Sequence, residues 1–182
     1  DLWGLPECSQ ITIETDDVVV GCGVTHNQII AEPGRDSALD LLRMACLEIG
    51  SPQLRNRATV VGNVVTASPA NDTISAPMAL DASIIMESAE GRRELPIREF
   101  FTGFRTTALQ QSELVRAIRI PRWTTNTLGT WLKVGNRSSQ AISVVHAGIV
   151  LGFDELTSTV TRADLAIGSV SETITLSAAF RN

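Results

Sequence analysis

The sequence is most informative from Arg55 to Thr73, which reads RNRATVVGNVVTASPANDT. This stretch gathers turn-forming and hydroxyl residues into a polar segment between two hydrophobic ones. Gly62 has no Cβ, so the backbone around it can approach a ligand closely, and the neighbouring hydroxyl and amide side chains suit hydrogen bonds to phosphate oxygens. We predict a loop that holds a phosphorylated ligand. Spacing alone leaves a plain structural loop as the alternative.

The end of this stretch predicts the start of a helix. Asn71 and Asp72 precede an apolar run at residues 74–80, and either side chain is suited to cap a helix there. The N–H groups of a first helical turn that have no partner in the helix favour anions. We therefore predict a helix over residues 73–80 whose first turn faces the ligand.

Length and charge exclude several classes of protein. A chain of 182 residues is long enough for one good-sized core or two small subdomains. The net charge of -5 and the absence of tyrosine argue against nucleic-acid binding, which relies on cationic and aromatic surface. No segment reads as a signal peptide, and the most apolar run, residues 141–153, is shorter than the roughly 20 residues that span a bilayer. These features predict a soluble, cytoplasmic protein.

The three cysteines, Cys8, Cys22 and Cys46, are isolated along the sequence. They form no Cys-x-x-Cys pair and have no histidine at metal-ligand spacing, so we expect buried free thiols and no metal site. His26 and His146 lie in a predicted turn and a predicted strand with no acid or thiol at motif spacing. We expect both histidines to be structural, and we expect no catalytic acid, base or nucleophile on this chain.

Hydrophobic periodicity predicts a mixture of helices and strands. Residues 36–50 read as an amphipathic helix that begins at an Asp-Ser cap and ends at Gly50. Charged residues 90–94 read as a solvated turn, and residues 97–101 as a helical turn. Alternating or apolar runs predict strands at residues 10–15, 18–22, 83–87, 114–120, 130–134, 142–153 and 159–167.

This order of elements predicts an α+β protein. Helices flank a mixed or antiparallel sheet in the first part of the chain, and a small sheet-rich part follows. Because the composition becomes rich in threonine and turns after Pro121, we place a boundary at residues 122–128. The predicted domains are residues 1–122 and 129–182.

Four segments carry a family resemblance: residues 20–26 (VGCGVTH), 49–57 (IGSPQLRNR) with 62–72, 100–105 (FFTGFR), and 132–137 (LKVGNR) followed by AIS at 141–143. In this order they resemble the FAD-binding domain, or medium subunit, of the molybdenum hydroxylases, the family of xanthine dehydrogenase, aldehyde oxidase and carbon monoxide dehydrogenase. The resemblance covers most of residues 20–150. It corresponds to the second lobe of that domain and the start of its C-terminal domain, and we expect the first lobe, with its own glycine-rich phosphate loop, to precede Asp1.

The resemblance implies a set of FAD contacts. Lys133 matches a lysine near the edge of the isoalloxazine ring, where a cation favours negative charge on the reduced flavin; the alternative is a surface lysine that extends its charge into water. In one departure from the family, Val61 and Gly62 stand where many relatives have two glycines. Residues expected to contact FAD through amides and hydroxyls are Thr59, Gly62, Asn63, Thr66, Ser68, Asn71 and Asp72, and those expected to line the cofactor with apolar surface are Ile49, Val65 and Leu109.

The implied function is electron transfer. Electrons would pass from [2Fe-2S] clusters to FAD on this chain and then to NAD, oxygen or a quinone. The molybdopterin would be held by a large subunit and the iron–sulfur clusters by a small subunit, with no nucleic-acid or membrane partner. The alternative is an incomplete flavin domain that holds no flavin and serves only as a subunit-interaction scaffold.

Overall fold

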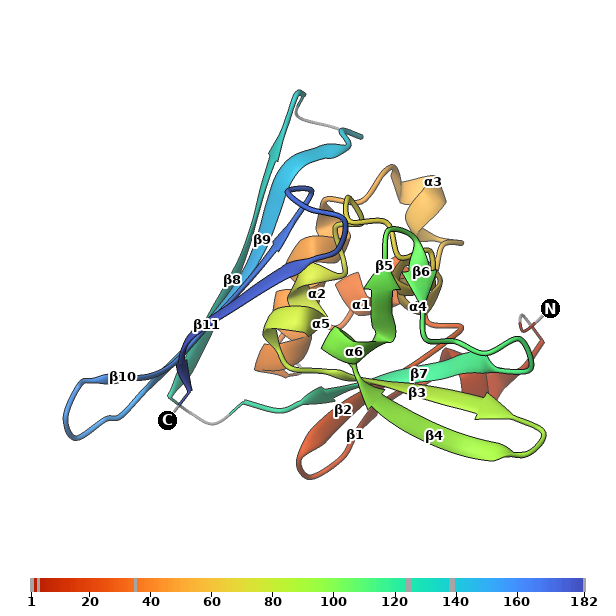
Figure 1. Cartoon of the computed structure of the whole chain (residues 1–182), viewed down its shortest axis with the longest axis horizontal. Helices are drawn as coiled ribbons and strands as arrows, with labels where there is room; N and C mark the ends of the chain where they lie inside the picture. Colours follow the sequence, from red (N-terminus) through yellow and green to blue (C-terminus); the bar gives the residue numbers. More distant parts are fainter. Residues whose placement is uncertain (1, 3, 35, 124–125, 138–139, 182) are drawn as a thin grey trace.

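The computed structural model describes residues 2, 4–34, 36–123, 126–137 and 140–181. Two antiparallel sheets enclose most of the helices between them (Figure 1). The helices are the 3-10 helix η1 (Pro6–Ser9) and α1 (His26–Ile30), α2 (Ser37–Leu47), α3 (Pro52–Arg55), α4 (Val60–Val65), α5 (Ser75–Ala79) and α6 (Ile97–Phe100). The strands are β1 (Ile11–Ile13), β2 (Asp17–Gly21), β3 (Ser83–Ser88), β4 (Gly91–Pro96), β5 (Phe101–Gly103), β6 (Thr106–Thr107), β7 (Leu114–Pro121), β8 (Thr127–Gly135), β9 (Ser143–Phe153), β10 (Val160–Gly168) and β11 (Thr175–Arg181).

The first sheet has the strand order β1-β2-β7-β3-β4, so its central strand, β7, comes from the end of this part of the chain. All its pairings are antiparallel, with Val20 opposite Ile118 and Ile118 opposite Ile84. These three side chains are fully buried, and the helices cover them on one side of the sheet. The alternation of β-branched residues therefore produces a sheet with one apolar face.

The second sheet has the order β11-β10-β9-β8 and rests on two helices. Strand β8 packs against α2, and β9 and β10 pack against α5. Gly148 makes this close approach possible, because a Cβ at that position would lie 2.6 Å from the carbonyl oxygen of Ser75. A larger residue there would force strand β9 away from α5.

The predicted α+β class is confirmed, and so are the helix at residues 37–47 and the predicted strands. Helix α2 begins where the sequence indicated, since the carboxylate of Asp36 accepts a hydrogen bond from the N–H of Ala38 at 3.0 Å. The division into domains 1–122 and 129–182 stays a prediction. Within the predicted boundary, residues 124–125 lie outside the described part of the chain.

Two segments differ from the sequence-based expectations. Of residues 90–94, expected as a charged turn, residues 91–94 belong to the edge strand β4 (Gly91–Pro96), which pairs with β3. Charged side chains are common on edge strands because they discourage further strand pairing, and Arg93 is held by Glu113 at 2.5 Å. Strand β11, residues 175–181, was not predicted.

The polar stretch at residues 55–73 was expected to be a loop, and this expectation was wrong. The stretch contains the end of α3 and all of α4. Valine-rich and glycine-containing segments have low intrinsic helix propensity. Here burial of Val60, Val61 and Val64 stabilises the helix, and the hydroxyl of Thr59 caps it by accepting from the N–H of Gly62.

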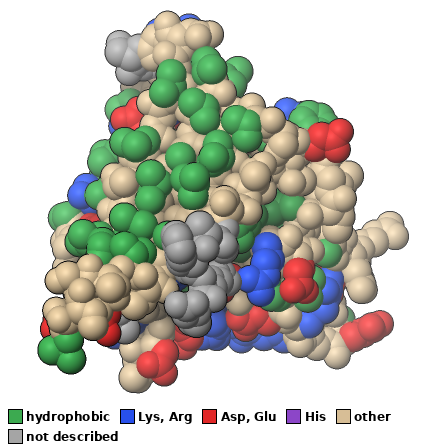
Figure 2. All heavy atoms as spheres, turned by 60° about the vertical axis from the view of Figure 1, so that its left-hand side comes forward, with side chains coloured by type: hydrophobic (Ala, Val, Ile, Leu, Met, Phe, Trp, Pro, Cys, Tyr) green, Lys and Arg blue, Asp and Glu red, His purple; other side chains and the backbone are tan. Residues whose placement is uncertain are grey.

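Apolar side chains cover the outward face of the second sheet (Figure 2). Leu128, Leu132 and Val134 on β8 are exposed, and across from them on β9 lie Leu151, Ala147 and Val145. None of the helices within the described ranges has the length and apolar character required to cross a bilayer.

Candidate functional site

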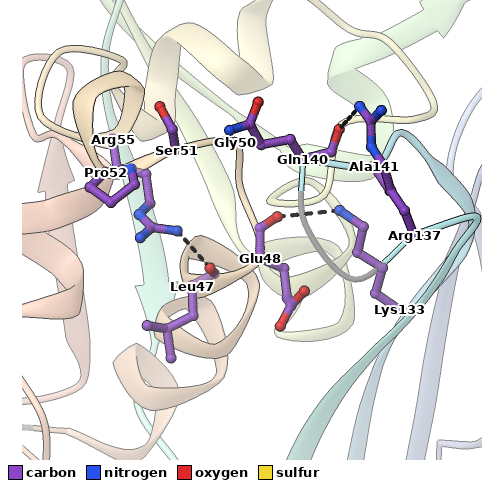
Figure 3. Close-up of a pocket in the computed structure, with 10 residues that line it drawn as sticks. All are labelled: Leu47, Glu48, Gly50, Ser51, Pro52, Arg55, Lys133, Arg137, Gln140 and Ala141. Atoms are coloured by element: carbon purple, nitrogen blue, oxygen red, sulfur yellow. Dashed lines mark hydrogen bonds between the residues drawn. The ribbon is translucent and has the colours of Figure 1, made fainter.

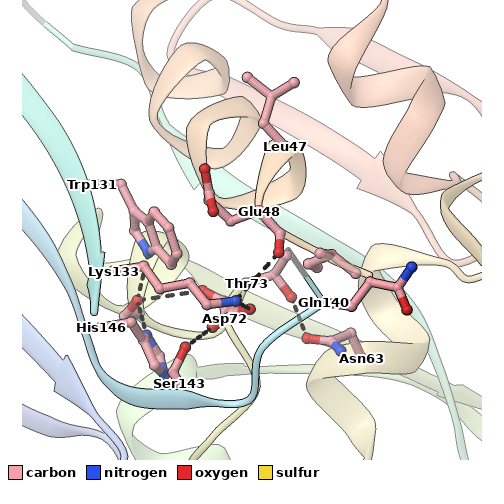
Figure 4. Close-up of polar contacts among 12 residues, drawn as sticks. Leu47, Glu48, Asn63, Asp72, Thr73, Trp131, Lys133, Gln140, Ser143 and His146 are labelled. Atoms are coloured by element: carbon pink, nitrogen blue, oxygen red, sulfur yellow. Dashed lines mark hydrogen bonds and ion pairs between the residues drawn. The ribbon is translucent and has the colours of Figure 1, made fainter. Parts of the chain in front are cut away.

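The candidate site lies where the end of α2, the segment between α4 and α5, and strands β8 and β9 meet (Figure 4). Its central contact is an ion pair between Lys133 of β8 and Asp72, with 2.7 Å between Nζ and Oδ2. Both side chains are nearly buried, 8% and 10% exposed. Ser143 of β9 donates a hydrogen bond to the other carboxylate oxygen of Asp72, Oδ1. Lys133 is therefore not a surface lysine with its charge in water, which excludes that alternative.

A second set of hydrogen bonds ties α4 to the segment that follows it. The side-chain amide of Asn71 donates to the carbonyl oxygen of Asn63 at 2.7 Å and also to the hydroxyl of Thr66. Thr73 donates to the side-chain oxygen of Asn63. The expectation that Asn71 or Asp72 caps the next helix was wrong, because α5 has Ile74 at its N-cap and no side-chain capping bond.

A third, largely buried network lies close to the ion pair. The indole N–H of Trp131 donates to the hydroxyl of Ser75 at 2.9 Å, and this hydroxyl lies 2.8 Å from Nδ1 of His146. On the other side of the ring, Nε2 of His146 lies 3.1 Å from the carbonyl oxygen of Pro69. A carbonyl only accepts, so Nε2 carries the proton, and Nδ1 of the neutral ring accepts from Ser75.

Burial is the main reason that the pKa of His146 is lowered from its ordinary value, and the nearby charge of Lys133 acts in the same direction. The carbonyl of Pro69 and the carboxylate of Asp72 oppose this shift. The neutral form satisfies every polar atom of the network. The prediction that His146 has a structural role thus agrees with its surroundings.

Two cations complete the C-terminal end of α2. A guanidinium N–H of Arg55 donates to the carbonyl oxygens of Leu47 and Ile49, at 2.8 Å and 3.1 Å, and Lys133 donates to that of Glu48 at 3.3 Å. Positive charge is favourable at this end of a helix. A cleft of about 210 Å³ opens beside these cations (Figure 3). Its lining residues are Leu47, Glu48, Gly50, Ser51, Pro52, Arg55, Lys133, Arg137, Gln140 and Ala141.

The structure brings most of the predicted site residues together. The N–H of Gly62 donates to the hydroxyl of Thr59 at 2.9 Å, which is the capping bond of α4. The contact of Gly62 with FAD stays a prediction. Val65 lies on α4, and Ser68 lies in the segment after it. Leu109 is half-buried between β6 and β7. Its described hydrogen bond is local, from its N–H to the hydroxyl of Thr107, and does not link it to Lys133.

Sequence reasoning missed several members of the site. Ser143 and His146 interrupt the apolar run at residues 141–153, which is the signal that marked them as unusual. Buried polar side chains in such a run need partners. The other members missed are Glu48, Arg55, Thr73, Ser75 and Trp131.

Comparison with known proteins identifies the family. A family described as "FAD binding domain in molybdopterin dehydrogenase" matches residues 1–123. The chain is 34% identical over 158 residues to the nicotinate dehydrogenase FAD-subunit of Eubacterium barkeri, covering 85% of this chain and 53% of that protein. It is 30% identical over 173 residues to the carbon monoxide dehydrogenase medium chain of Hydrogenophaga pseudoflava, covering 95% and 59%.

The fold agrees with this relationship. The solved carbon monoxide dehydrogenase of Hydrogenophaga pseudoflava superposes with a TM-score of 0.87 at 29% identity, covering 94% of this chain and 58% of that one. The chain thus spans a little over half the length of these relatives. The segments quoted above for the resemblance lie largely within the matched residues. The chain belongs to the family of FAD-binding domains of the molybdopterin dehydrogenases, the molybdenum hydroxylases.

Proposed function

We propose that this chain is part of the flavoprotein subunit of a molybdenum hydroxylase and that the region around α4 and Lys133 binds FAD. The observation that carries the proposal is the network that joins Lys133 to Asp72 and joins Asn71 to Asn63 and Thr66. Five residues that the resemblance assigned to FAD thereby form one continuous polar surface from two distant parts of the chain. Family membership supports the same proposal.

The hydrogen-bond donors on this surface are of the chemical type that binds a dinucleotide. No described residue accepts a hydrogen bond from the side-chain amide of Asn63 or from the hydroxyl of Ser68. The hydroxyl of Thr59 accepts from Gly62, and its own proton has no acceptor among the described residues. Neutral donors of this kind suit the diphosphate and ribityl oxygens. We propose that these side chains hold those oxygens.

Lys133 has a distinct part in the proposal. Its ammonium group has three N–H donors, of which two are used by Asp72 and the carbonyl of Glu48. It also lines the cleft at the end of α2 (Figure 3). We propose that the third N–H meets the flavin ring from this cleft, and that Asp72 limits the net positive charge that the ring experiences.

FAD, when bound, would supply the redox chemistry, and we propose [2Fe-2S] clusters as the source of the electrons and NAD, oxygen or a quinone as their acceptor. The residues of this chain bind and orient it, and none of them needs to act as an acid, base or nucleophile. We further propose a molybdopterin-binding large subunit and an iron–sulfur small subunit as partners. The printed names of the relatives, "medium chain" and "FAD-subunit", support a multisubunit assembly.

Reconstitution tests FAD binding. The purified chain is mixed with excess FAD, freed of unbound cofactor and examined for flavin absorbance. We expect a bound chromophore, and we expect Asn63→Asp to weaken binding at least about tenfold, because it removes a donor and adds negative charge near the diphosphate. Asn126→Asp, the same change in the turn before β8, is the matched control and should leave the affinity unchanged.

The alternative function is a scaffold that holds no flavin. The exposed apolar face of β8 and β9 is the observation that favours it, since such surfaces commonly mark interaction sites. The two functions separate in one measurement. A chain that is folded by circular dichroism but retains no flavin from excess FAD would contradict the flavoprotein proposal and support the scaffold.

A further inference from the structure

Two cysteines from different elements, Cys8 and Cys22, come together beside an arginine. Cys8 lies in η1 and Cys22 directly follows β2. The backbones meet closely, since the N–H of Gly23 donates to the carbonyl oxygen of Cys8 at 2.7 Å. A Cβ on Gly21 would lie 2.3 Å from that same oxygen, so glycine is required for the approach.

Arg116 of β7 orients the pair. Its Nη1 donates to the sulfur of Cys8 at 2.8 Å, and the thiol of Cys22 is within hydrogen-bonding reach of both Cys8 and Arg116. The guanidinium is itself held by the carboxylate of Glu87, with 3.4 Å between Nε and Oε2, and by the carbonyl of Glu7 at 3.5 Å. A cation directed at a sulfur stabilises negative charge on it, which is the condition for a reactive thiolate.

Both cysteines line hollows large enough for a small oxidant, although neither residue is exposed. Cys8 and Cys22 are 2% and 7% exposed, and both are free thiols. Cys8 and Arg116 line a hollow of about 350 Å³. Cys22 lines another of about 220 Å³, together with Leu2, Ser9, Gly23 and Thr59.

We propose that Cys8 and Cys22 form a redox-active dithiol, which a hydroperoxide such as hydrogen peroxide oxidises to a disulfide. The thiolate of Cys8 attacks one peroxide oxygen and breaks the O–O bond, which gives a sulfenic acid on Cys8 and a hydroxide that is protonated to water. The sulfur of Cys22 then attacks the sulfenic sulfur. The S–S bond forms, and the sulfenic oxygen leaves as a second water with the proton of Cys22. Two electrons thus pass from the two thiols to the peroxide.

The two cysteines have different roles in this step. Nη1 of Arg116 donates to the sulfur of Cys8 at 2.8 Å, and Cys8 and Arg116 line the same hollow, so we assign Cys8 as the attacking thiol. Burial is the first cause that raises the pKa of the Cys22 thiol from its ordinary value, and contact with Cys8 adds to it. Arg116 opposes this shift. Cys22, which contacts Cys8, is assigned as the resolving thiol.

Thiol counting after peroxide treatment tests the proposal. The intact chain, reduced and then treated with hydrogen peroxide, is denatured, titrated with a thiol reagent and weighed by mass spectrometry. Of the three thiols, we expect one to remain, with a mass lower by two hydrogens and full recovery on addition of dithiothreitol. Peptide mapping should place the bridge between Cys8 and Cys22. Three remaining thiols, or a bridge to Cys46 or between two chains, would overturn the proposal.

Variants assign the roles and control for folding. Cys22→Ser should stop the reaction at a sulfenic acid on Cys8, which dimedone labels, whereas Cys8→Ser should react at neither position. Arg116→Gln should slow oxidation about tenfold and Arg116→Lys much less; equal rates in the wild type and Arg116→Gln would show that the arginine does not activate Cys8. Cys46→Ser is the matched control, because Cys46 is fully buried in α2 and should not affect the bridge. This test involves no flavin, so its result is independent of the proposed FAD site.

Discussion

Both faces of the second sheet carry apolar side chains, with Trp131 and Val150 buried on the inner one, but the inner face also buries polar groups. The inner face, against α2 and α5, carries polar and ionisable groups, among them Lys133, Ser143 and His146. The outer face carries aliphatic side chains. In adjacent positions of β8, the side chain of Lys133 is 8% exposed whereas Leu132 is 57% exposed.

The difference shows what each face contributes. A buried polar group costs free energy unless it has a partner, and each of the inner groups named above has one. These partners come from the segment at residues 69–75, so the inner face has one favourable way to dock on α5. The outer face has apolar area but no directional contacts, and it imposes no such constraint.

Of the changes that test this difference between the faces, loss of the Lys133–Asp72 ion pair should lower the stability most. Asp72→Ala is expected to lower the free energy of unfolding by about 3 kcal/mol, because it leaves the charge of Lys133 nearly buried and without its carboxylate. Urea denaturation measures the change. The control is Arg98→Gln, which breaks the exposed Arg98–Asp81 pair and should cost less than about 1 kcal/mol. A similar loss of unfolding free energy in both variants would show that the buried Lys133–Asp72 pair stabilises the fold no more than an exposed pair does.

Acid should weaken the inner face through His146. The folded state lowers the pKa of His146 below the ordinary value, so the unfolded chain binds the proton more strongly. The stabilisation is present above about pH 6.5 and is lost as the pH falls toward the folded pKa, by at most about 1.4 kcal/mol per pH unit for this one group. Urea denaturation at several pH values measures how the free energy of unfolding depends on pH. Below pH ~6.5 this free energy should fall less steeply with pH for His146→Gln than for the wild type. Equal slopes would mean that His146 does not titrate in this range.

A substitution on the outer face should have the smallest effect on stability. Leu132→Thr keeps a residue suited to strands and is expected to change the free energy of unfolding by less than about 0.5 kcal/mol. The same variant should reduce the fluorescence of a dye that binds exposed apolar surface, such as ANS. A loss of stability comparable to that of Asp72→Ala would show that the outer face is packed in solution.

Local sequence patterns predicted much of the fold. The apolar stripe of residues 37–47 and the β-branched runs of β2, β7 and β9 lead to the observed elements, because these elements follow from short-range periodicity. The pattern failed at α4, where burial of three valines outweighs poor helix propensity, and at β4, where charges mark an edge strand and not a turn. Both failures are cases in which tertiary contacts override local preference.

The sequence by itself determined the α+β class, the polar segment at residues 55–73 and membership of the flavin-domain family, because these depend on the order and type of residues along the chain. Tertiary structure alone decided that Lys133 pairs with Asp72, 61 positions away, and that Cys8 meets Cys22 beside Arg116. It also decided which face of the second sheet is buried, since alternation along a strand does not say which face docks on the helices. The physical reason is that such contacts depend on how the sheets and helices dock, and docking is set by the packing of the whole chain.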